Sequence, residues 1–120
     1  MQRLICKSKI HGIYVTGTDL HYEGSIEIDG EILEKADILP HEIVQVINIA
    51  NGERFETYVL SGKKGKGACR LYGGAARLGK KGDELIIISY AILETVDART
   101  YKPKIIRVNR KNQMVKKGIK

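Results

Sequence analysis

The stretch HEIVQVINIANGERFETYVL, residues 41–60, decides the fold of this chain. Its first half is rich in β-branched residues that alternate with polar ones, a pattern typical of a half-buried strand. Asn51-Gly52 then favours the positive φ angles of a type I′ turn. Residues 54–60 have the composition of a returning strand. The sequence therefore predicts a β-hairpin in the middle of the chain.

Other strands are predicted on both sides of this hairpin. Residues 1–16 read as one bent strand or two short ones around His11-Gly12. Residues 25–29, SIEID, alternate as a strand that a turn at Asp29-Gly30 closes. The apolar run ELIIISYAIL, residues 84–93, predicts a strand buried on both faces, and residues 105–109 predict a last strand.

One short helix is predicted between the first strands and the hairpin. Ile32, Leu33 and Ala36 recur at helical spacing before Pro40 stops the run. The Gly-Lys clusters of residues 61–84 read as loops. Many short strands with one or two short helices favour a mainly β, single domain over residues 1–120, folded as a small closed or nearly closed barrel.

Composition limits the class of protein. A chain of 120 residues with 42% apolar and 29% charged residues forms one globular domain of ordinary size. It lacks the run of about 18 apolar residues that a membrane span needs, and its start does not resemble a secretory signal. We therefore expect a cytoplasmic protein without a membrane partner. Cys6 and Cys69 stand apart from other metal ligands and are expected to be reduced thiols.

The net charge of +7 at first suggests an anionic partner such as nucleic acid. However, eight of the 21 Lys and Arg lie in residues 100–120, which contain no acid, so residues 1–99 carry 13 against 14 acids. The surplus is thus a property of a basic C-terminal tail, about residues 103–120. A small basic barrel that binds nucleic acid stays an alternative, although 6% aromatic residues without Trp leave few stacking platforms.

Four stretches carry side chains suited to chemistry. They are Lys9 with His11, HYEGS at residues 21–25, RFETY at residues 54–58, and LYGGAA at residues 71–76. Each has a plain structural interpretation: a lone His is usually structural, and Gly-Ser is usually a turn. The sequence contains no H-E-x-x-H, C-x-x-C or G-x-S-x-G, so metal hydrolysis and Ser-His-Asp acyl transfer lack their parts.

Taken together, four segments resemble the pyruvoyl-dependent aspartate 1-decarboxylases. They are KSKIHGIYVTGTDLHYEGSIEID at residues 7–29, NGERFETYVL at 51–60, GGAAR at 73–77 and GDELIIISYA at 82–91. The resemblance implies a six-stranded double-psi β-barrel that assembles as a homotetramer with active sites between neighbouring subunits. It also implies decarboxylation of L-aspartate to β-alanine, which supplies pantothenate and coenzyme A.

The resemblance further implies that the chain is a proenzyme that cuts itself between Gly24 and Ser25. The fragments would be residues 1–24 and 25–120, and Ser25 would become a covalent pyruvoyl group that forms a Schiff base with the substrate. Neither pyridoxal phosphate nor a metal is then required. A maturation factor is left open.

Site roles follow from the same resemblance. Tyr58 is expected to be the proton donor. Thr57 is expected to hold the Gly24 carbonyl during cleavage and to touch the substrate, although strand alternation places it on the face opposite Tyr58. The remaining substrate-binding positions are Lys9, Arg54, Gly73, Gly74 and Ala75, and His11, Tyr22 and Tyr72 are expected to line the pocket.

Two positions depart from the family pattern. Tyr72 stands where the family commonly has Asn, and Gly74 stands where it commonly has Ala. A Tyr is larger than Asn and offers only a hydroxyl. A homologue whose self-cleavage is impaired through Tyr72 is therefore a further alternative. The tail after about Lys102 is expected to lie outside the matched region.

Overall fold

The computed structural model describes residues 1–115 as one nine-stranded sheet with short helical elements. The strands are β1 (Gln2–Tyr14), β2 (Gly17–Asp19), β3 (Ser25–Asp29), β4 (Ile43–Asn48), β5 (Arg54–Gly62), β6 (Cys69–Tyr72), β7 (Glu84–Glu94), β8 (Lys104–Val108) and β9 (Met114–Val115). The helical elements are α1 (Gly30–Ala36), the 3₁₀ turn η1 (Gly73–Arg77) and α2 (Thr95–Ala98). The expectation of a mainly β fold is confirmed.

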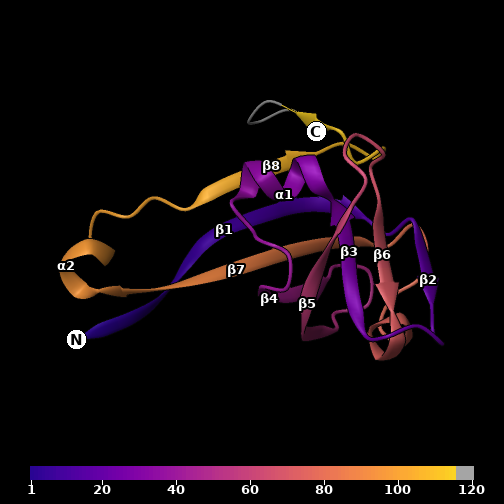
Figure 1. The fold of residues 1–120 in the computed structure, drawn as a ribbon, viewed down its shortest axis with the longest axis horizontal. Coiled ribbons are helices and arrows are strands. Elements are labelled where there is room, and N and C mark those ends of the chain that lie inside the picture. The colour runs from indigo at the N-terminus through magenta and orange to yellow at the C-terminus, as the bar shows by residue number, and fades with distance from the viewer. Residues whose placement is uncertain (116–120) are drawn as a thin grey trace.

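The strands pair in the order β2-β6-β3-β5-β4-β7-β1-β8-β9. This order has nine strands rather than six, and within residues 1–115 it ends at β2 and β9 instead of closing. The double-psi topology stays a prediction. β1 and β7 form a long antiparallel ribbon that ends near α2 and the N-terminus, whereas β3, β6 and β2 gather at the opposite end of the molecule (Figure 1).

β1 is one bent strand, as the pattern of residues 1–16 allowed. Its pairing with β7 shifts register between Cys6 and Ser8 and again between His11 and Ile13. Gly12, which lies at the second shift, has φ +87°. A glycine tolerates this left-handed conformation without the steric penalty of a side chain. Gly12 therefore allows β1 to bend at this point.

The predicted hairpin is confirmed as β4 and β5, but its turn differs from the expected two-residue type I′ turn. The loop spans residues 49–53, and Asn48 N donates to Glu53 O at 2.8 Å. Asn48 Oδ1 accepts from Ala50 N and Asn51 Oδ1 from Glu53 N, each at 2.9 Å. These side-chain bonds satisfy amides inside the loop and so stabilise a wider connection.

The core is formed by β-branched and leucine side chains of the sheet and by the buried face of α1. The fully buried members include Ile10, Ile26, Ile28, Val44, Val46, Val59, Leu71, Leu85, Ile87 and Val108. The turn expected at Asp29-Gly30 is not present. Instead, Asp29 caps α1, and its carboxylate accepts from Glu31 N at 2.8 Å. The predicted helix is confirmed, since Ile32, Leu33 and Ala36 are buried.

β7 departs from the expectation of a strand buried on both faces. Leu85, Ile87 and Ser89 are fully buried, whereas Ile86 and Ile88 are half-buried and Ile92 is 65% exposed. The cause is that only one face of β7 turns toward the core.

Part of the basic tail belongs to the fold. β8 confirms the predicted last strand and pairs parallel with β1, from Ser8 opposite Lys104 to His11 opposite Arg107. The buried Asn112 side chain donates to Tyr14 O at 2.7 Å and to Gly67 O at 2.9 Å. The last residues of the basic tail, which its composition predicts to be solvated, reach into residues 116–120, and these lie outside the described residues.

Candidate active site at the start of β3

The loop after β2 brings Gly24 and Ser25 to the start of β3. Asp19 Oδ1 accepts from His21 N at 3.1 Å, a side-chain turn that reverses the chain direction. Ser25 is fully buried, and its Oγ donates to Glu23 O at 3.2 Å. The hydroxyl therefore folds back along the preceding peptide, toward the Gly24–Ser25 bond, and does not face solvent.

The backbone of Gly73 packs directly against Gly24. Gly73 has φ +64°, and a Cβ added there would stand 2.6 Å from both Gly24 Cα and Gly24 N. Pairing of β3 with β6 sets Ser25 opposite Tyr72, so the chain enters η1 immediately beside the Gly24–Ser25 bond. A Cβ at Gly74, by contrast, would meet no heavy atom within 4 Å. Ala75 is 8% exposed.

Tyr58 lies on the neighbouring strand on the other side of β3. β3 and β5 are parallel with Ile26 opposite Val59, and continuing this register by one residue brings Ser25 beside Tyr58. Partners in a parallel pair point to the same face, and neighbouring strands are about 4.8 Å apart. Tyr58 is half-buried, with its ring centroid 6.1 Å from that of His41. Tyr58, Ser25 and Tyr72 therefore form a row across β5, β3 and β6.

Tyr72 interacts with the side chains of Tyr22, Glu27 and Arg70 at this site. Its ring centroid lies 4.7 Å from that of Tyr22 at an interplanar angle of 56°, and its hydroxyl donates to Glu27 Oε1. Burial raises the pKa of Tyr72, and the hydrogen bond to Glu27 raises it further, which outweighs the smaller lowering effect of Arg70. The phenol thus keeps its proton at neutral pH and acts as a donor.

Thr57 and Arg54 stand apart from Ser25 on β5. Thr57 is half-buried and lies opposite Val44, on the face away from Tyr58, as alternation predicted. Within residues 1–115 no hydrogen bond joins Thr57 to Gly24. Arg54 starts β5, four residues or about 13 Å along the strand from Tyr58, and its guanidinium donates to Gln45 Oε1 at 3.0 Å.

Lys9 and His11 lie on β1, and in the sheet order β5, β4 and β7 stand between β1 and β3. Lys9 is paired with Ile88 on β7 and Ile105 on β8. His11 lines a groove of about 750 Å³ together with Glu84, Arg110 and Lys111. The sequence-predicted residues therefore fall into two groups, one around Ser25 and one on β1.

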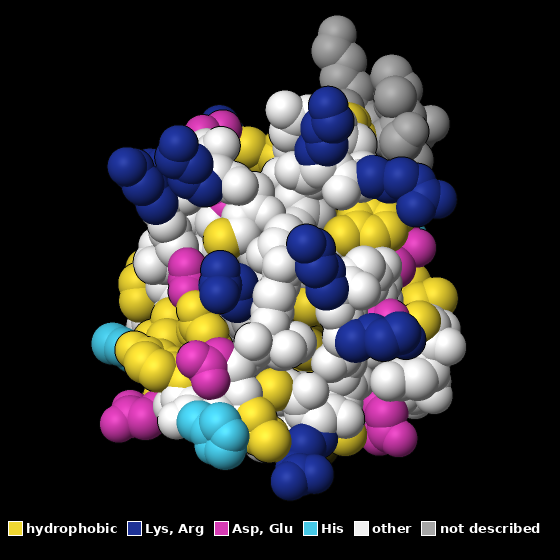
Figure 2. All heavy atoms as spheres, turned by 90° about the vertical axis from the view of Figure 1, so that its right-hand side faces the viewer, with side chains coloured by type: hydrophobic (Ala, Val, Ile, Leu, Met, Phe, Trp, Pro, Cys, Tyr) yellow, Lys and Arg dark blue, Asp and Glu magenta, His cyan; other side chains and the backbone are white. Residues whose placement is uncertain are grey.

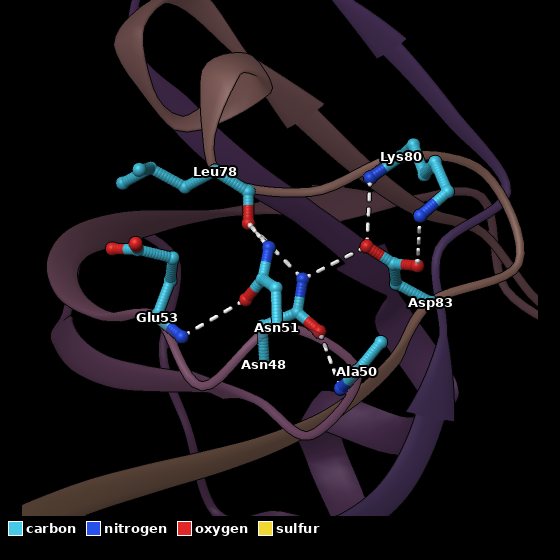
Figure 3. Close-up of polar contacts among 7 residues, drawn as sticks. All are labelled: Asn48, Ala50, Asn51, Glu53, Leu78, Lys80 and Asp83. Atoms are coloured by element: carbon cyan, nitrogen blue, oxygen red, sulfur yellow. Dashed lines mark hydrogen bonds and ion pairs between the residues drawn. The ribbon is translucent and has the colours of Figure 1, made fainter.

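A polar network that sequence reasoning did not single out holds the loop after η1 (Figure 3). Asn48 Nδ2 donates to Leu78 O at 3.0 Å and to Asp83 Oδ2 at 2.9 Å. Asn51 Nδ2 also donates to Leu78 O, and Lys80 N donates to Asp83 Oδ2, both at 3.0 Å. In the sequence this network is indicated only by Asn48, a polar residue at the end of the β-branched run that forms β4.

The bond from Asn48 is the main cause that lowers the pKa of Asp83, and it prevails over burial, which raises the pKa. Asp83 is therefore a buried carboxylate that stays ionised near neutral pH. The network joins the β4–β5 loop to residues 78–83, the segment that follows η1. It thereby fixes the far end of the turn that covers Gly24.

The described surface and side chains offer few other features of a site. On the face in Figure 2, Lys and Arg side chains are interspersed with acidic and apolar ones. Among residues 1–115 no three His, Cys, Asp or Glu gather as metal ligands, and no helix is long and apolar enough to cross a membrane. Cys6 and Cys69 are free thiols, and burial raises the pKa of Cys69 to about 12.

Comparison with known proteins matches residues 1–115 to the family model described as aspartate decarboxylase. The expectation that the tail after Lys102 lies outside the matched region is therefore wrong. Proteins named aspartate 1-decarboxylase are similar along most of their length. The one from Thermoanaerobacter pseudethanolicus is 53% identical over 96% of this chain and 98% of its own. That from Pelotomaculum thermopropionicum is 55% identical over 91% and 83%. That from Kosmotoga olearia is 52% identical over 98% and 100%. The chain belongs to the aspartate decarboxylase family.

Proposed function

We propose that this protein is a proenzyme that cuts itself at Gly24–Ser25 and then converts L-aspartate to β-alanine and CO₂. The observation that carries the proposal is the buried Ser25, whose hydroxyl lies back along the peptide while Gly73 packs on Gly24. It occurs in a chain whose relatives are named aspartate 1-decarboxylase. The product would supply pantothenate and coenzyme A synthesis in the cytoplasm.

Self-cleavage uses groups of Gly24 and Ser25 together with water. Ser25 Oγ attacks the Gly24 carbonyl carbon, the C–N bond breaks, and the hydroxyl proton passes to the released nitrogen, which leaves an ester. Loss of the Ser25 Cα proton then expels the Gly24 carboxylate by breaking the Cβ–Oγ bond. Hydrolysis of the resulting dehydroalanine releases ammonia and leaves an N-terminal pyruvoyl group on residues 25–120.

The surroundings of Ser25 fit such a group. Position 25 is buried at a strand start, with Tyr72 on one side and Tyr58 on the other. A small planar α-keto acyl group there is shielded from bulk water yet lies beside a phenol that can donate a proton. When formed, the pyruvoyl ketone supplies the electron sink for loss of the substrate α-carboxylate.

Each other residue has a simpler task. Tyr58 donates the proton that replaces CO₂ at the substrate α-carbon. The backbone of Gly73, Gly74 and Ala75 and the hydroxyl of Thr57 contact the substrate, and Tyr22 and Tyr72 wall the pocket. Arg54 lies about 13 Å along β5 from Tyr58 within one chain, so in this proposal Arg54 of a neighbouring subunit binds a substrate carboxylate through its planar fork, and Lys9 adds positive charge.

Lys9 and His11 reach the site from a neighbouring subunit in this proposal. The sheet order supports it, because three strands separate β1 from β3 within one chain. Exposed apolar side chains also support assembly: Leu4 and Ile92 face each other across β1 and β7 and are 66% and 65% exposed. A homotetramer would bury such side chains and complete each site.

Denaturing mass spectrometry tests the proposal. Purified protein should give two fragments that meet between Gly24 and Ser25, the larger one blocked to Edman degradation and reactive toward hydrazines. Ser25→Ala should remain one uncut chain without decarboxylase activity. A wild-type chain that stays intact after prolonged warming and forms no hydrazine adduct would contradict the proposal.

A further inference from the structure

Tyr72 contacts one residue on each side of the Gly24–Ser25 bond. Its ring packs on that of Tyr22, which precedes the bond, and its hydroxyl donates to the carboxylate of Glu27, which follows the bond. After a cut at this bond, Tyr22 would belong to the smaller fragment and Glu27 to the larger one. The side chain of Tyr72 therefore spans the scissile segment.

The strand register explains how one side chain reaches both neighbours. Ser25 lies opposite Tyr72 and Glu27 opposite Arg70 in the antiparallel pair of β3 and β6. Ser25 and Glu27 point to the same face of β3, so Tyr72 reaches Glu27 along the diagonal of the pair. The Glu27 carboxylate also lies close to β5, since a Cβ at Gly62 would stand 2.9 Å from Glu27 Oε2.

The backbone next to Tyr72 completes the hold on Gly24. A Cβ at Gly24 would stand 3.8 Å from Tyr72 O, and one at Gly73 would stand 2.9 Å from Tyr22 O. Two consecutive residues, Tyr72 and Gly73, thus pack over the segment from Tyr22 to Gly24. Tyr72 adds the two side-chain contacts that Gly73 cannot make.

We propose that Tyr72 is a positioning residue for self-cleavage, acting through Tyr22 and Glu27. This inference rests on the proposed function. Attack of Ser25 Oγ on the Gly24 carbonyl carbon requires the hydroxyl to be held close to that carbon and above the plane of the carbonyl group, and restraint of the flanking residues raises the fraction of chains in that geometry. The hydroxyl of Tyr72 takes no part in bond making or breaking.

By the family resemblance, Tyr72 stands where an Asn is expected. An Asn side chain offers neither the ring for Tyr22 nor the length to reach Glu27 across the strand pair. The proposal therefore predicts that Tyr72→Asn slows cleavage in this chain. The alternative that Tyr72 impairs processing predicts that the same change speeds it.

The experiment follows the uncut fraction over time by intact mass, starting from freshly purified precursor. Tyr72→Phe, which keeps the ring and loses the hydroxyl, should cut about tenfold more slowly than wild type, as should Glu27→Ala. The double variant should be no slower than either single variant, because the two residues act as one unit. Glu27→Gln, which still accepts a hydrogen bond, should fall between wild type and Glu27→Ala.

Tyr101→Phe is the matched control, since it removes a phenol hydrogen bond of 2.9 Å to Lys7 O on β1. It should cut at the wild-type rate. Melting temperatures of the uncut precursors separate positioning from general destabilisation. The Tyr72→Phe precursor should cut more slowly than the Tyr101→Phe precursor although its melting temperature is no lower.

The outcomes are distinguishable. A wild-type chain that never cuts contradicts the proposed function and this inference together. A wild-type chain that cuts, with Tyr72→Phe equally fast or Tyr72→Asn faster, overturns the inference alone and leaves the proposed function standing.

Discussion

Gly73 and Gly24 lie backbone against backbone, so close that a Cβ at Gly73 would stand 2.6 Å from Gly24 Cα. The contact joins residues far apart in the chain and places the start of η1 over the Gly24–Ser25 bond. The contact leaves room for the second Hα atom of glycine at position 73 but not for a methyl group.

Gly73→Ala should destabilise the protein and block processing. An Ala at φ +64° costs about 1–2 kcal/mol, and its methyl group would push against backbone, which cannot rotate away. The melting temperature should fall and the uncut precursor should accumulate. Gly74→Ala is the control, because a Cβ there meets no heavy atom within 4 Å. Equal behaviour of the two variants would contradict the close contact between the Gly73 and Gly24 backbones.

Tyr58→Phe should leave folding and self-cleavage intact and reduce turnover of aspartate. Loss of a positioned general acid typically lowers the rate by about 10² to 10⁴. Steady-state assays of β-alanine formation on fully cleaved enzyme measure this, and kcat should fall more than KM rises. Tyr101→Phe should retain turnover. Full activity of Tyr58→Phe would mean that another group donates the proton.

Lys9→Ala and Ser25→Ala should complement each other if sites are shared between subunits. Each variant alone should have little activity, since one lacks the cation on β1 and the other lacks the hydroxyl on β3. Co-expressed chains should recover activity on the order of a quarter of wild type through sites that pair intact residues from two subunits. Lack of any recovery in isolated mixed oligomers would place both residues in the same chain's site.

Asp83 should make stability depend on acidic pH. Its pKa lies below the ordinary 3.8, chiefly because of the Asn48 hydrogen bond, so the folded state favours the ionised form. That stability is present above the unfolded pKa and is lost as pH falls through the folded pKa. The free energy of unfolding of the wild type, measured with urea, should therefore decrease as the pH falls below about 4.

Asp83→Asn should lose roughly 1–3 kcal/mol at pH 7 by weakening this buried network. Its deficit relative to wild type should shrink at low pH, where the wild-type carboxyl is also neutral. Glu53→Gln, an exposed change in the adjacent loop, should leave both stability and its pH dependence unchanged. A constant deficit at all pH values would show that the charge of Asp83 is not what stabilises the network.

The sequence by itself determined the elements with strong local patterns and the identity of the candidate site residues. Alternation identified β3 and the β4–β5 pair, and helical spacing identified α1, because side-chain periodicity reports which face is buried. Ordered motifs such as HYEGS and RFETY carried the family resemblance, which the comparison then confirmed. These features depend on residues close together in the chain.

Only the tertiary structure decided which distant segments meet. Parallel pairing of β3 with β5 sets Tyr58 beside Ser25, and antiparallel pairing with β6 brings Gly73 onto Gly24 and Tyr72 onto Glu27. Periodicity gives the face of a strand but neither its neighbour nor its register. The same reason explains β7, whose apolar run has one buried face, and the parallel pairing of the predicted strand β8 with β1.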